Sequence, residues 1–312
     1  MNKRPNLITV TGQPGAGKTT MCKKLAEELG WEYFYTGMVM RKLAEDRGIS
    51  ITEINKLAET DRSFDKIVDS VYLDISKSDK PHIIDARLAW YFLPDSFKVM
   101  FEVPLSIGAQ RVMAADKRVS ESYRDLPSAM HSMKVRREAE RTKHRNSYGI
   151  ENDGDLNHFD LVLDTAYSSP DRNVSFVRAA FSLWQKGIRL PKVWMSPKSL
   201  YPTHDVAKMS EPQVEHLSKK FAEYGYDTIE PLMTAVYGDQ VHIIDGHHRA
   251  AAAIHAGCDF IPVILLQDGD TLLGGKTVEV YLRSHVTAEL LAAWENKHGF
   301  MFSMPSTMTS AA

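Results

Sequence analysis

The fold of this 312-residue chain is decided by one stretch, Leu7-Ile8-Thr9-Val10-Thr11 followed by Gly12-Gln13-Pro14-Gly15-Ala16-Gly17-Lys18-Thr19-Thr20. The first five residues have the pattern of a short buried strand. Apolar residues spaced along 21–29 predict a helix after the glycines, ending at Gly30. Glycines between a strand and a helix let backbone N–H groups turn toward an anion, and the helix N-terminus adds partial positive charge. The complete Gly-x-x-x-x-Gly-Lys-Thr pattern in this setting predicts a phosphate-binding loop.

The same motif predicts roles for single residues. Lys18 is expected to reach the β- and γ-phosphates of ATP, and Thr19 to ligate Mg²⁺ through its hydroxyl. Asp85 follows the strand-like residues 82–84, where a carboxylate can hold magnesium-bound water or accept a proton from the acceptor. The loop residues expected to bind the nucleotide are Gly12, Gln13, Pro14, Gly15, Ala16, Gly17, Lys18, Thr19 and Thr20.

Composition restricts the class of protein. Hydrophobic residues make up 43% and charged residues 25%, which is ordinary for a soluble globular chain. The formal net charge is -2, so the overall charge does not argue for nucleic acid or membrane binding. The two cysteines form no disulfide framework or zinc pattern, and no apolar run approaches the roughly 20 residues of a membrane span. These features predict a soluble, cytoplasmic protein.

The order of elements predicts two domains. Strand-like residues at 82–85, 99–103 and 161–163 alternate with helical patterns, which is typical of a parallel α/β sheet. We expect a first domain over 1–187 and a linker over 188–197, because Gly187, Pro191 and Pro197 interrupt the pattern there. A second, smaller α/β domain over 198–285 and a C-terminal helix and tail over 286–312 are expected to follow.

Residues 112–148 are rich in arginine and helical in pattern. Arg137, Arg141 and Arg145 are spaced i, i+4, i+8 and therefore share one face of a helix. Such a face is often only a solvated surface. In a phosphotransferase, however, guanidinium groups can neutralise the charge that develops on the transferring phosphoryl group, and we favour this role for Arg137 and Arg141.

Residues 7 to about 180 resemble the nucleoside monophosphate kinases, and most closely the archaeal-type cytidylate kinases. The resemblance implies a P-loop core, an acceptor-binding helical insert at about 36–78, and an arginine-rich lid at about 112–148 that closes over ATP. It is carried by Tyr35-Thr36-Gly37…Arg41, Ala44-Glu45-Asp46-Arg47-Gly48-Ile49-Ser50, Asp85-Ala86-Arg87-Leu88-Ala89-Trp90, Arg136…Glu140-Arg141, Tyr148-Gly149-Ile150, and Phe159-Asp160-Leu161-Val162-Leu163-Asp164-Thr165…Ser169-Pro170.

This resemblance also implies roles for arginines outside the loop. Arg41 and Arg87 hold the phosphate of the acceptor, Arg111 lies near adenine, and Arg136 and Arg141 act on the transition state together with Lys18 and Asp85. The chain departs from the usual family pattern at two positions, Met38 and Ala86. We place both on the acceptor side, so use of ATP and Mg²⁺ follows from the likeness whereas CMP as the acceptor does not.

A second motif lies at Gly246-His247-His248-Arg249, after a strand-like segment. A glycine turn, a helix N-terminus and a guanidinium together suit an anion, and we favour phosphate binding. The stretch resembles the Gly-x-His-Arg box of the ParB/sulfiredoxin superfamily, whose members act on nucleotides, small molecules or DNA. Two other interpretations stay open: a metal site at the histidines, and a purely structural turn that caps the helix.

Three functions are compatible with these features. The first is a cytidylate-type kinase of CMP or dCMP with an accessory domain. The second, which we favour, is a kinase of 5-hydroxymethyluracil in DNA; the domain pairing resembles bacteriophage kinases that act during thymidine hypermodification, and such a chain works in the host cytoplasm. The third is an ATP-gated DNA-binding module without an acceptor, which the Arg41 and Arg87 pair disfavours.

Overall fold

The structure is a computed structural model, and it describes residues 4–61, 63–115, 123–225, 230–237, 240–266, 270–272 and 275–302. The chain divides into two compact units. The first comprises Met1–Phe101, Val112–Leu161 and Pro170–Leu190, and the second comprises Glu102–Arg111, Val162–Ser169 and Pro191–Ala312. Each unit is described by itself below.

The sheet of the first unit is parallel, as the alternation of strands and helices predicts. Its strands stand in the order β2-β3-β1-β4. In the register of the sheet, Val10 and Tyr35 are both opposite Asp85, so the carboxyl ends of β1, β2 and β3 meet at one edge. Ligands of open parallel sheets bind at this edge. The bounds of these strands are Leu7–Gly12 (β1), Glu32–Tyr35 (β2), His82–Asp85 (β3) and Phe97–Glu102 (β4).

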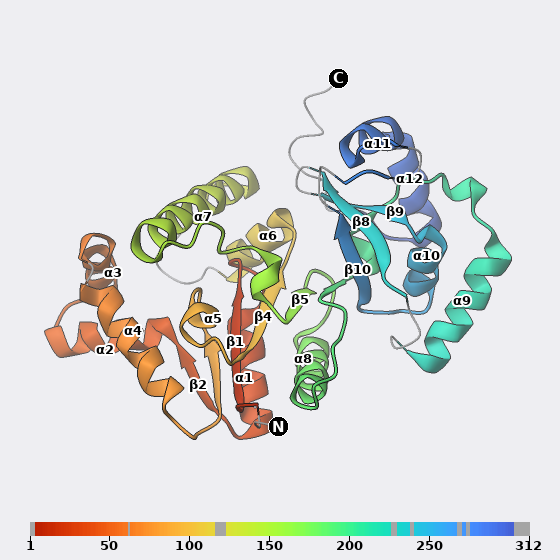
Figure 1. Cartoon of the computed structure of the whole chain (residues 1–312). Coiled ribbons are helices and arrows are strands. Elements are labelled where there is room, and N and C mark those ends of the chain that lie inside the picture. Colours follow the sequence, from red (N-terminus) through yellow and green to blue (C-terminus); the bar gives the residue numbers. More distant parts are fainter. Residues whose placement is uncertain are drawn as a thin grey trace. The chain divides into compact units, whose positions relative to one another are not determined.

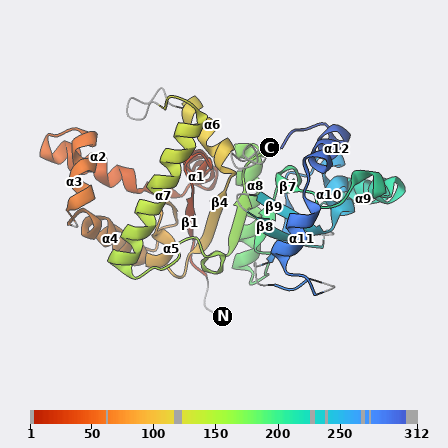
Figure 2. The same cartoon turned by 90° about the horizontal axis from the view of Figure 1, so that it is seen from above.

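The helices of the first unit confirm the expected helical insert and the long helix of the lid. The insert consists of α2, α3 and α4, and Figure 1 shows α7 beyond the carboxyl end of β1. Seen from above in Figure 2, α7 runs across this end of the sheet. The bounds are Lys18–Leu29 (α1), Thr36–Arg47 (α2), Ile51–Thr60 (α3), Ser63–Ser76 (α4), Ala89–Phe92 (α5), Leu126–Tyr148 (α7), Leu156–His158 (the 3₁₀ helix η1) and Pro170–Gln185 (α8).

Local sequence sets the starts of two of these helices. Ser50 and Glu53 form a reciprocal capping box at α3, with the Glu53 N–H on Ser50 Oγ at 3.2 Å and the Ser50 N–H on Glu53 Oε2 at 2.8 Å. Asp125 caps α7 in the same way through Ser128. These caps satisfy N–H groups that a helix leaves unpaired at its first turn.

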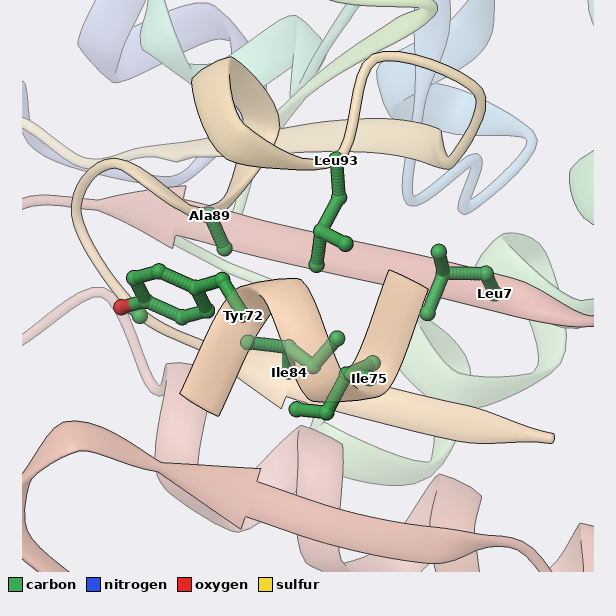
Figure 3. Close-up of a cluster of buried hydrophobic side chains, with 7 residues drawn as sticks. Leu7, Tyr72, Ile75, Ile84, Ala89 and Leu93 are labelled. Atoms are coloured by element: carbon green, nitrogen blue, oxygen red, sulfur yellow. The ribbon is translucent and has the colours of Figure 1, made fainter. Parts of the chain in front are cut away.

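An apolar cluster joins β1 and β3 to α4 and α5 and fixes the edge that carries Asp85 (Figure 3). Tyr72 packs there and stacks on Phe92 at a ring distance of 5.2 Å. Ala86 is a buried member of this cluster, and its expected place on the acceptor side stays a prediction. The buried members are Leu7, Tyr72, Ile75, Ile84, Ala86, Ala89 and Leu93.

The second unit is also α/β, but its sheet is mixed. Its strands stand in the order β5-β6-β10-β8-β9-β7, with antiparallel pairs at β6/β10 and β8/β9 and parallel pairs at β5/β6, β10/β8 and β9/β7. The sequence Tyr237-Gly238-Asp239 predicts a turn between two of these strands, but Gly238 and Asp239 lie outside the described residues. The strand bounds are Leu161–Asp164 (β5), Val193–Met195 (β6), Leu200–Tyr201 (β7), Leu232–Tyr237 (β8), Gln240–Asp245 (β9) and Ile261–Leu266 (β10).

The expected linker at 188–197 contains strand β6, which pairs with both β5 and β10. The second unit also takes up Glu102–Arg111 and Val162–Ser169, which the sequence placed in the first domain. Among the helices of the described ranges, none is long and apolar enough to cross a bilayer. The remaining helices are Leu105–Ala115 (α6), Pro197–Ser199 (η2), Val206–Lys208 (η3), Glu211–Tyr224 (α9), His247–His255 (α10), Val278–His285 (α11) and Ala288–His298 (α12).

Candidate active site

The phosphate-binding loop has the predicted strand–loop–helix setting. Gly12 ends β1 with φ 141°, and a Cβ there would lie 2.2 Å from the carbonyl oxygen of Phe101. Gly17 caps α1 with φ 77°, in the left-handed region. Only glycine fits the first position sterically, and glycine is strongly favoured at the second. Both glycines therefore fix the path of the backbone that would surround phosphate oxygens.

Lys18 is half-buried at the start of α1. Its Nζ donates to the carbonyl of Gln13, within the same loop, at 2.8 Å. Burial and the nearby Arg87 lower the pKa of Lys18 to about 8, although Asp85 and Glu140 act in the opposite direction. Because burial and Arg87 disfavour the charged form of Lys18, an anionic ligand beside Nζ would strongly stabilise the ammonium. This suits the expected place of Lys18 on the β- and γ-phosphates.

The structure brings Thr19 and Asp85 together, as the motif predicts for a magnesium site. Thr19 Oγ1 donates to Asp85 Oδ2 at 2.8 Å, and the hydroxyl of Tyr33 donates to the same oxygen at 3.4 Å. Burial, followed by the charge of Asp85, raises the pKa of Tyr33, so the phenol stays protonated as a donor. One hydroxyl and one carboxylate are the hard oxygen ligands that Mg²⁺ takes beside substrate phosphates. Within the described ranges, no cluster of three or more acidic, histidine or cysteine residues suited to a metal occurs.

The two arginines expected to hold the acceptor follow neighbouring strands: Arg87 lies in the loop after β3, and Arg41 lies on α2, the helix after β2. Arg87 donates from Nη1 to the carbonyl of Gly12 at 3.0 Å, which places it against the phosphate loop. Arg41, on α2, donates to the hydroxyl of Tyr35, and its guanidinium lies 5.5 Å from the centre of that ring. Tyr35 is the residue opposite Asp85 in the sheet. Both arginines are thus tied to the edge where β1, β2 and β3 end.

Helix α7 carries the arginines of the lid, and these arginines differ in their exposure and in their partners. Arg137 forms two hydrogen bonds to Asp153, at 2.9 and 2.7 Å, and His144 Nδ1 lies 2.6 Å from the same carboxylate. Burial alone would raise the pKa of Asp153, but His144 and Arg137 lower it to about 2. This ion pair gives Arg137 a structural partner within its own unit. Arg136 and Arg141 are more exposed, with 57% and 45% of the side chain accessible, and Arg141 Nε also lies 3.8 Å from Oδ1 of Asp153.

Two residues of this site, Glu140 and Asp153, were assigned no role from the sequence. Glu140 ion-pairs with Arg87 at 3.2 Å and with Arg136 at 3.2 Å. Asp153 holds the buried face of α7, with only 3% of its side chain exposed. The i, i+4 spacing of Arg136 and Glu140 was a usable signal for the first residue. No periodic signal marks Asp153, which lies in the loop after α7.

Arg111, on α6, falls in the second unit. Its Nη2 donates to the carbonyls of Thr165 at 2.9 Å and Ala166 at 2.7 Å. These bonds hold the loop that follows β5. The expected place of Arg111 near adenine stays a prediction.

The turn at Gly246 has the conformation expected from its sequence, with φ 105°. Its two histidines accept backbone N–H groups: His247 Nε2 from Thr203 at 3.0 Å and His248 Nε2 from Ser210 at 3.1 Å. Burial, followed by the nearby His204 and His248, lowers the pKa of His247 to about 3, so this imidazole is neutral at pH 7. Both rings therefore hold the segment 203–210 in place.

Arg249 is also engaged within the second unit. Its Nη1 donates to the carbonyls of Glu230 and Pro231 at 2.9 and 3.2 Å, and its Nη2 to Asp245 at 3.2 Å. These contacts support the structural interpretation of the turn. Phosphate binding by Gly246, His247, His248 and Arg249 stays a prediction.

Comparison with known proteins agrees with this geometry. Residues 7–167 match the model of the cytidylate kinase-like family. The cytidylate kinase of Natronomonas pharaonis is 34% identical over 180 residues, which cover 57% of this chain and 90% of the relative. The cytidylate kinase of Pyrococcus furiosus is 33% identical over 175 residues, which cover 56% of this chain and 87% of the relative.

Solved structures give weaker likenesses. Shikimate kinase from Acinetobacter baumannii in complex with shikimate has a TM-score of 0.41 at 18% identity and covers 59% of this chain and 96% of its own. The chromosome-partitioning protein ParB from Caulobacter crescentus, bound to its parS site, has a TM-score of 0.21 at 22% identity and covers 25% of this chain and 40% of its own. Because these scores are low, the assignment rests on the sequence relatives. With its P-loop, its Thr19–Asp85 pair and these relatives, the chain belongs to the cytidylate kinase-like family and is a kinase that uses ATP and Mg²⁺.

Proposed function

We propose that this kinase transfers the γ-phosphoryl group of ATP to a pyrimidine nucleotide whose own phosphate is held by Arg87 and Arg41. The position of Arg87 carries this proposal. Its guanidinium is bonded to the carbonyl of Gly12, at the start of the phosphate loop, and its charge is close enough to Lys18 to lower the pKa of that lysine. A phosphate on Arg87 would therefore lie beside the phosphates of ATP, as transfer between two nucleotides requires.

The chemistry of this site is positioning and charge neutralisation. Lys18 and the loop N–H groups would bind the phosphates of ATP, and Thr19 and Asp85 would hold Mg²⁺, which neutralises phosphate charge when bound. An acceptor oxygen attacks the γ-phosphorus, and the bond from that phosphorus to the oxygen of ADP breaks. Arg136 and Arg141 would stabilise the charge on the transferring group from α7, where both are exposed.

A second candidate acceptor is the hydroxyl of 5-hydroxymethyluracil in DNA, and the second unit favours it. The match to the curated relatives takes up most of their length but only a little over half of this chain. Pro191–Ala312 lie beyond the residues of the family match, and a kinase of free nucleotides does not require them. A kinase of DNA, in contrast, needs contacts that grip the backbone.

Two further features bear on the DNA acceptor. Met38, which departs from the family pattern, is 44% exposed on α2, whereas Ala86 is buried in the core and gives this candidate no support. This candidate includes a likeness of the second unit to ParB/sulfiredoxin proteins and phosphate binding by the Gly246 turn. It also includes a bacteriophage source and activity in the host cytoplasm. The non-enzymatic module is disfavoured because the chain belongs to a kinase family.

One experiment separates the acceptors. The full chain is supplied with [γ-³²P]ATP and Mg²⁺, together with CMP, dCMP, unmodified DNA or DNA containing 5-hydroxymethyluracil. Labelled CDP or dCDP with unlabelled DNA supports the monophosphate acceptor. Label on hydroxymethylated DNA alone supports the second candidate. If neither acceptor is labelled although ATP binds, a pyrimidine nucleotide is not the acceptor.

A further inference from the structure

Glu140 connects two arginines that are expected to touch phosphate groups. On one side, its Oε1 lies 3.2 Å from Nε of Arg136, one turn earlier on α7. On the other side, its Oε2 lies 3.2 Å from Nη2 of Arg87, in the loop after β3. Both Glu140 and Arg87 are largely shielded from water, with 22% and 24% of their side chains exposed. One carboxylate therefore ties α7 to the residue beside the phosphate loop.

The contact between Glu140 and Arg87 is an ion pair without the geometry of a hydrogen bond. Oε2 of Glu140 is buried and accepts no hydrogen bond from the described part of the chain. A buried carboxylate oxygen without a donor is unfavourable. Arg87, for its part, uses Nη1 on the carbonyl of Gly12 and presents Nη2 to Glu140. Phosphate oxygens accept such N–H groups in a bidentate geometry, which this carboxylate does not provide.

The charges around Glu140 show which cations its carboxylate neutralises. Burial lowers the pKa of Arg87, and the neighbouring Arg137 and Arg136 lower it further, whereas Glu140 raises it. Glu140 also raises the pKa of Lys18, against burial and Arg87. Arg87 is thus repelled by Lys18, Arg136 and Arg137, and Glu140 and Asp153 supply the negative charge that favours the charged form of Arg87. A phosphate group brings the same charge.

We propose that Glu140 is an exchangeable counter-ion of Arg87, which the phosphate of the acceptor replaces when it binds. Glu140 keeps its contact with Arg136 on α7 while Arg87 turns to the phosphate. Glu140 is then a positioning residue that competes with the acceptor and lowers its affinity. The exchange also releases the tie between α7 and the loop after β3. This inference rests on the proposed function, in which Arg87 holds the acceptor.

The first test compares Glu140→Gln with the wild-type chain. A neutral amide of the same shape competes weakly for Arg87, so KM for the acceptor is expected to fall about threefold to tenfold, the worth of a half-buried ion pair. KM for ATP is expected to change less. Glu138→Gln is the matched control, because Glu138 is exposed on the same helix. A higher acceptor KM with a lower kcat in Glu140→Gln would show that Glu140 orients Arg87 for the acceptor, which overturns the exchange.

The second test does not depend on the identity of the acceptor. Sodium sulfate is titrated into the full chain by calorimetry, with ADP saturating so that the phosphate loop is filled. Sulfate is expected to bind Glu140→Gln about threefold to tenfold more tightly than wild type or Glu138→Gln. Equal affinities would overturn the inference. Tighter sulfate binding without phosphorylation of any pyrimidine nucleotide would instead leave the exchange standing and refute the proposed function.

A folding defect is monitored by thermal melting of each variant. If Glu140→Gln fails to fold, Glu140→Asp takes its place in both tests. That variant keeps the charge but withdraws it by one methylene group. It is expected to shift acceptor KM and sulfate affinity in the same direction by a smaller factor, and unchanged values in a folded Glu140→Asp protein count against the exchange.

Discussion

Thr19 and Asp85 are joined by a hydrogen bond of 2.8 Å, from the first turn of α1 to the end of β3. The strand register places Asp85 opposite Val10, a few residues before the phosphate loop. Sheet and loop geometry together therefore position this hydroxyl–carboxylate pair. Its position explains why a short strand, buried at its first three residues, ends in an acidic residue.

We expect Asp85→Asn to raise the Mg²⁺ concentration for half-maximal activity about tenfold or more, because an amide is a weaker ligand than a carboxylate for a hard cation. Activity is measured over a Mg²⁺ titration at saturating ATP. Asp95→Asn is the control, since Asp95 is exposed. An unchanged Mg²⁺ requirement would remove Asp85 from the metal site.

The low pKa of Lys18 predicts a pH dependence. The ammonium is mostly charged at pH 7 and loses its proton as pH rises through about 8, whereas an ordinary lysine would do so near 10.5. Because kcat/KM for ATP reports groups of the free enzyme, it is expected to decline above about pH 8, approaching tenfold per pH unit. The profile is measured by initial rates from pH 6 to 10.

Two variants check the assignment of this decline to Lys18. Lys18→Arg keeps its charge across the range, so its residual activity should lack the decline near pH 8. Lys18→Ala should lose phosphoryl transfer but keep its thermal stability, since a half-buried cation is removed and no core contact. Near-normal turnover in folded Lys18→Ala contradicts the proposed kinase site.

Arg141 is expected to act mainly in the transition state. Arg141→Ala should lower kcat by about 10²-fold to 10³-fold while KM for ATP stays within about threefold. Arg145→Ala is the matched control, one turn further on α7, where Arg145 pairs with the exposed Glu151. A collapse of ATP affinity with unchanged kcat would make Arg141 a ground-state ligand of ATP.

Local pattern predicted the parts of the structure that depend on local sequence. The phosphate loop and the helix α1 after it follow from spacing within a few residues, and the insert of α2 to α4 agrees with what the family resemblance implies. Strand β6 was missed because three residues between prolines carry no periodicity. It exists because its edges pair with β5 and β10, which come from distant parts of the chain.

In the candidate site, too, the residues determined by local sequence were predictable and the long-range contacts were not. Lys18, Thr19 and Asp85 could be placed because motif and strand end determine them, but the partners of Arg87 and Arg137 could not. Arg87 meets Glu140 only when α7 packs across the sheet edge. Arg249 looked free for an anion in the sequence, whereas folding brings it to the carbonyls of Glu230 and Pro231. Long-range packing decides which charged side chains are already paired.

The pairing of Arg137 with Asp153 predicts a measurable cost of its loss. Asp153→Asn keeps the shape but leaves the largely buried Arg137 without its counter-charge, so the free energy of unfolding should fall by about 2–4 kcal/mol at pH 7. Glu151→Gln, which breaks an exposed ion pair with Arg145, should cost about 0.5 kcal/mol or less. Both are measured by urea unfolding.

The same ion pair fixes the pH range in which this cost disappears. The pKa of Asp153 is about 2 in the folded chain and 3.8 without these partners, so the unfolded chain binds more protons between the two values. The contribution of the carboxylate is therefore complete above about pH 5 and is lost as pH falls through 3.8 toward 2. Unfolding curves of wild type and Asp153→Asn should converge over that range. If instead the two proteins unfold alike at pH 7, the ion pair contributes little, and Arg137 is available for the phosphoryl group.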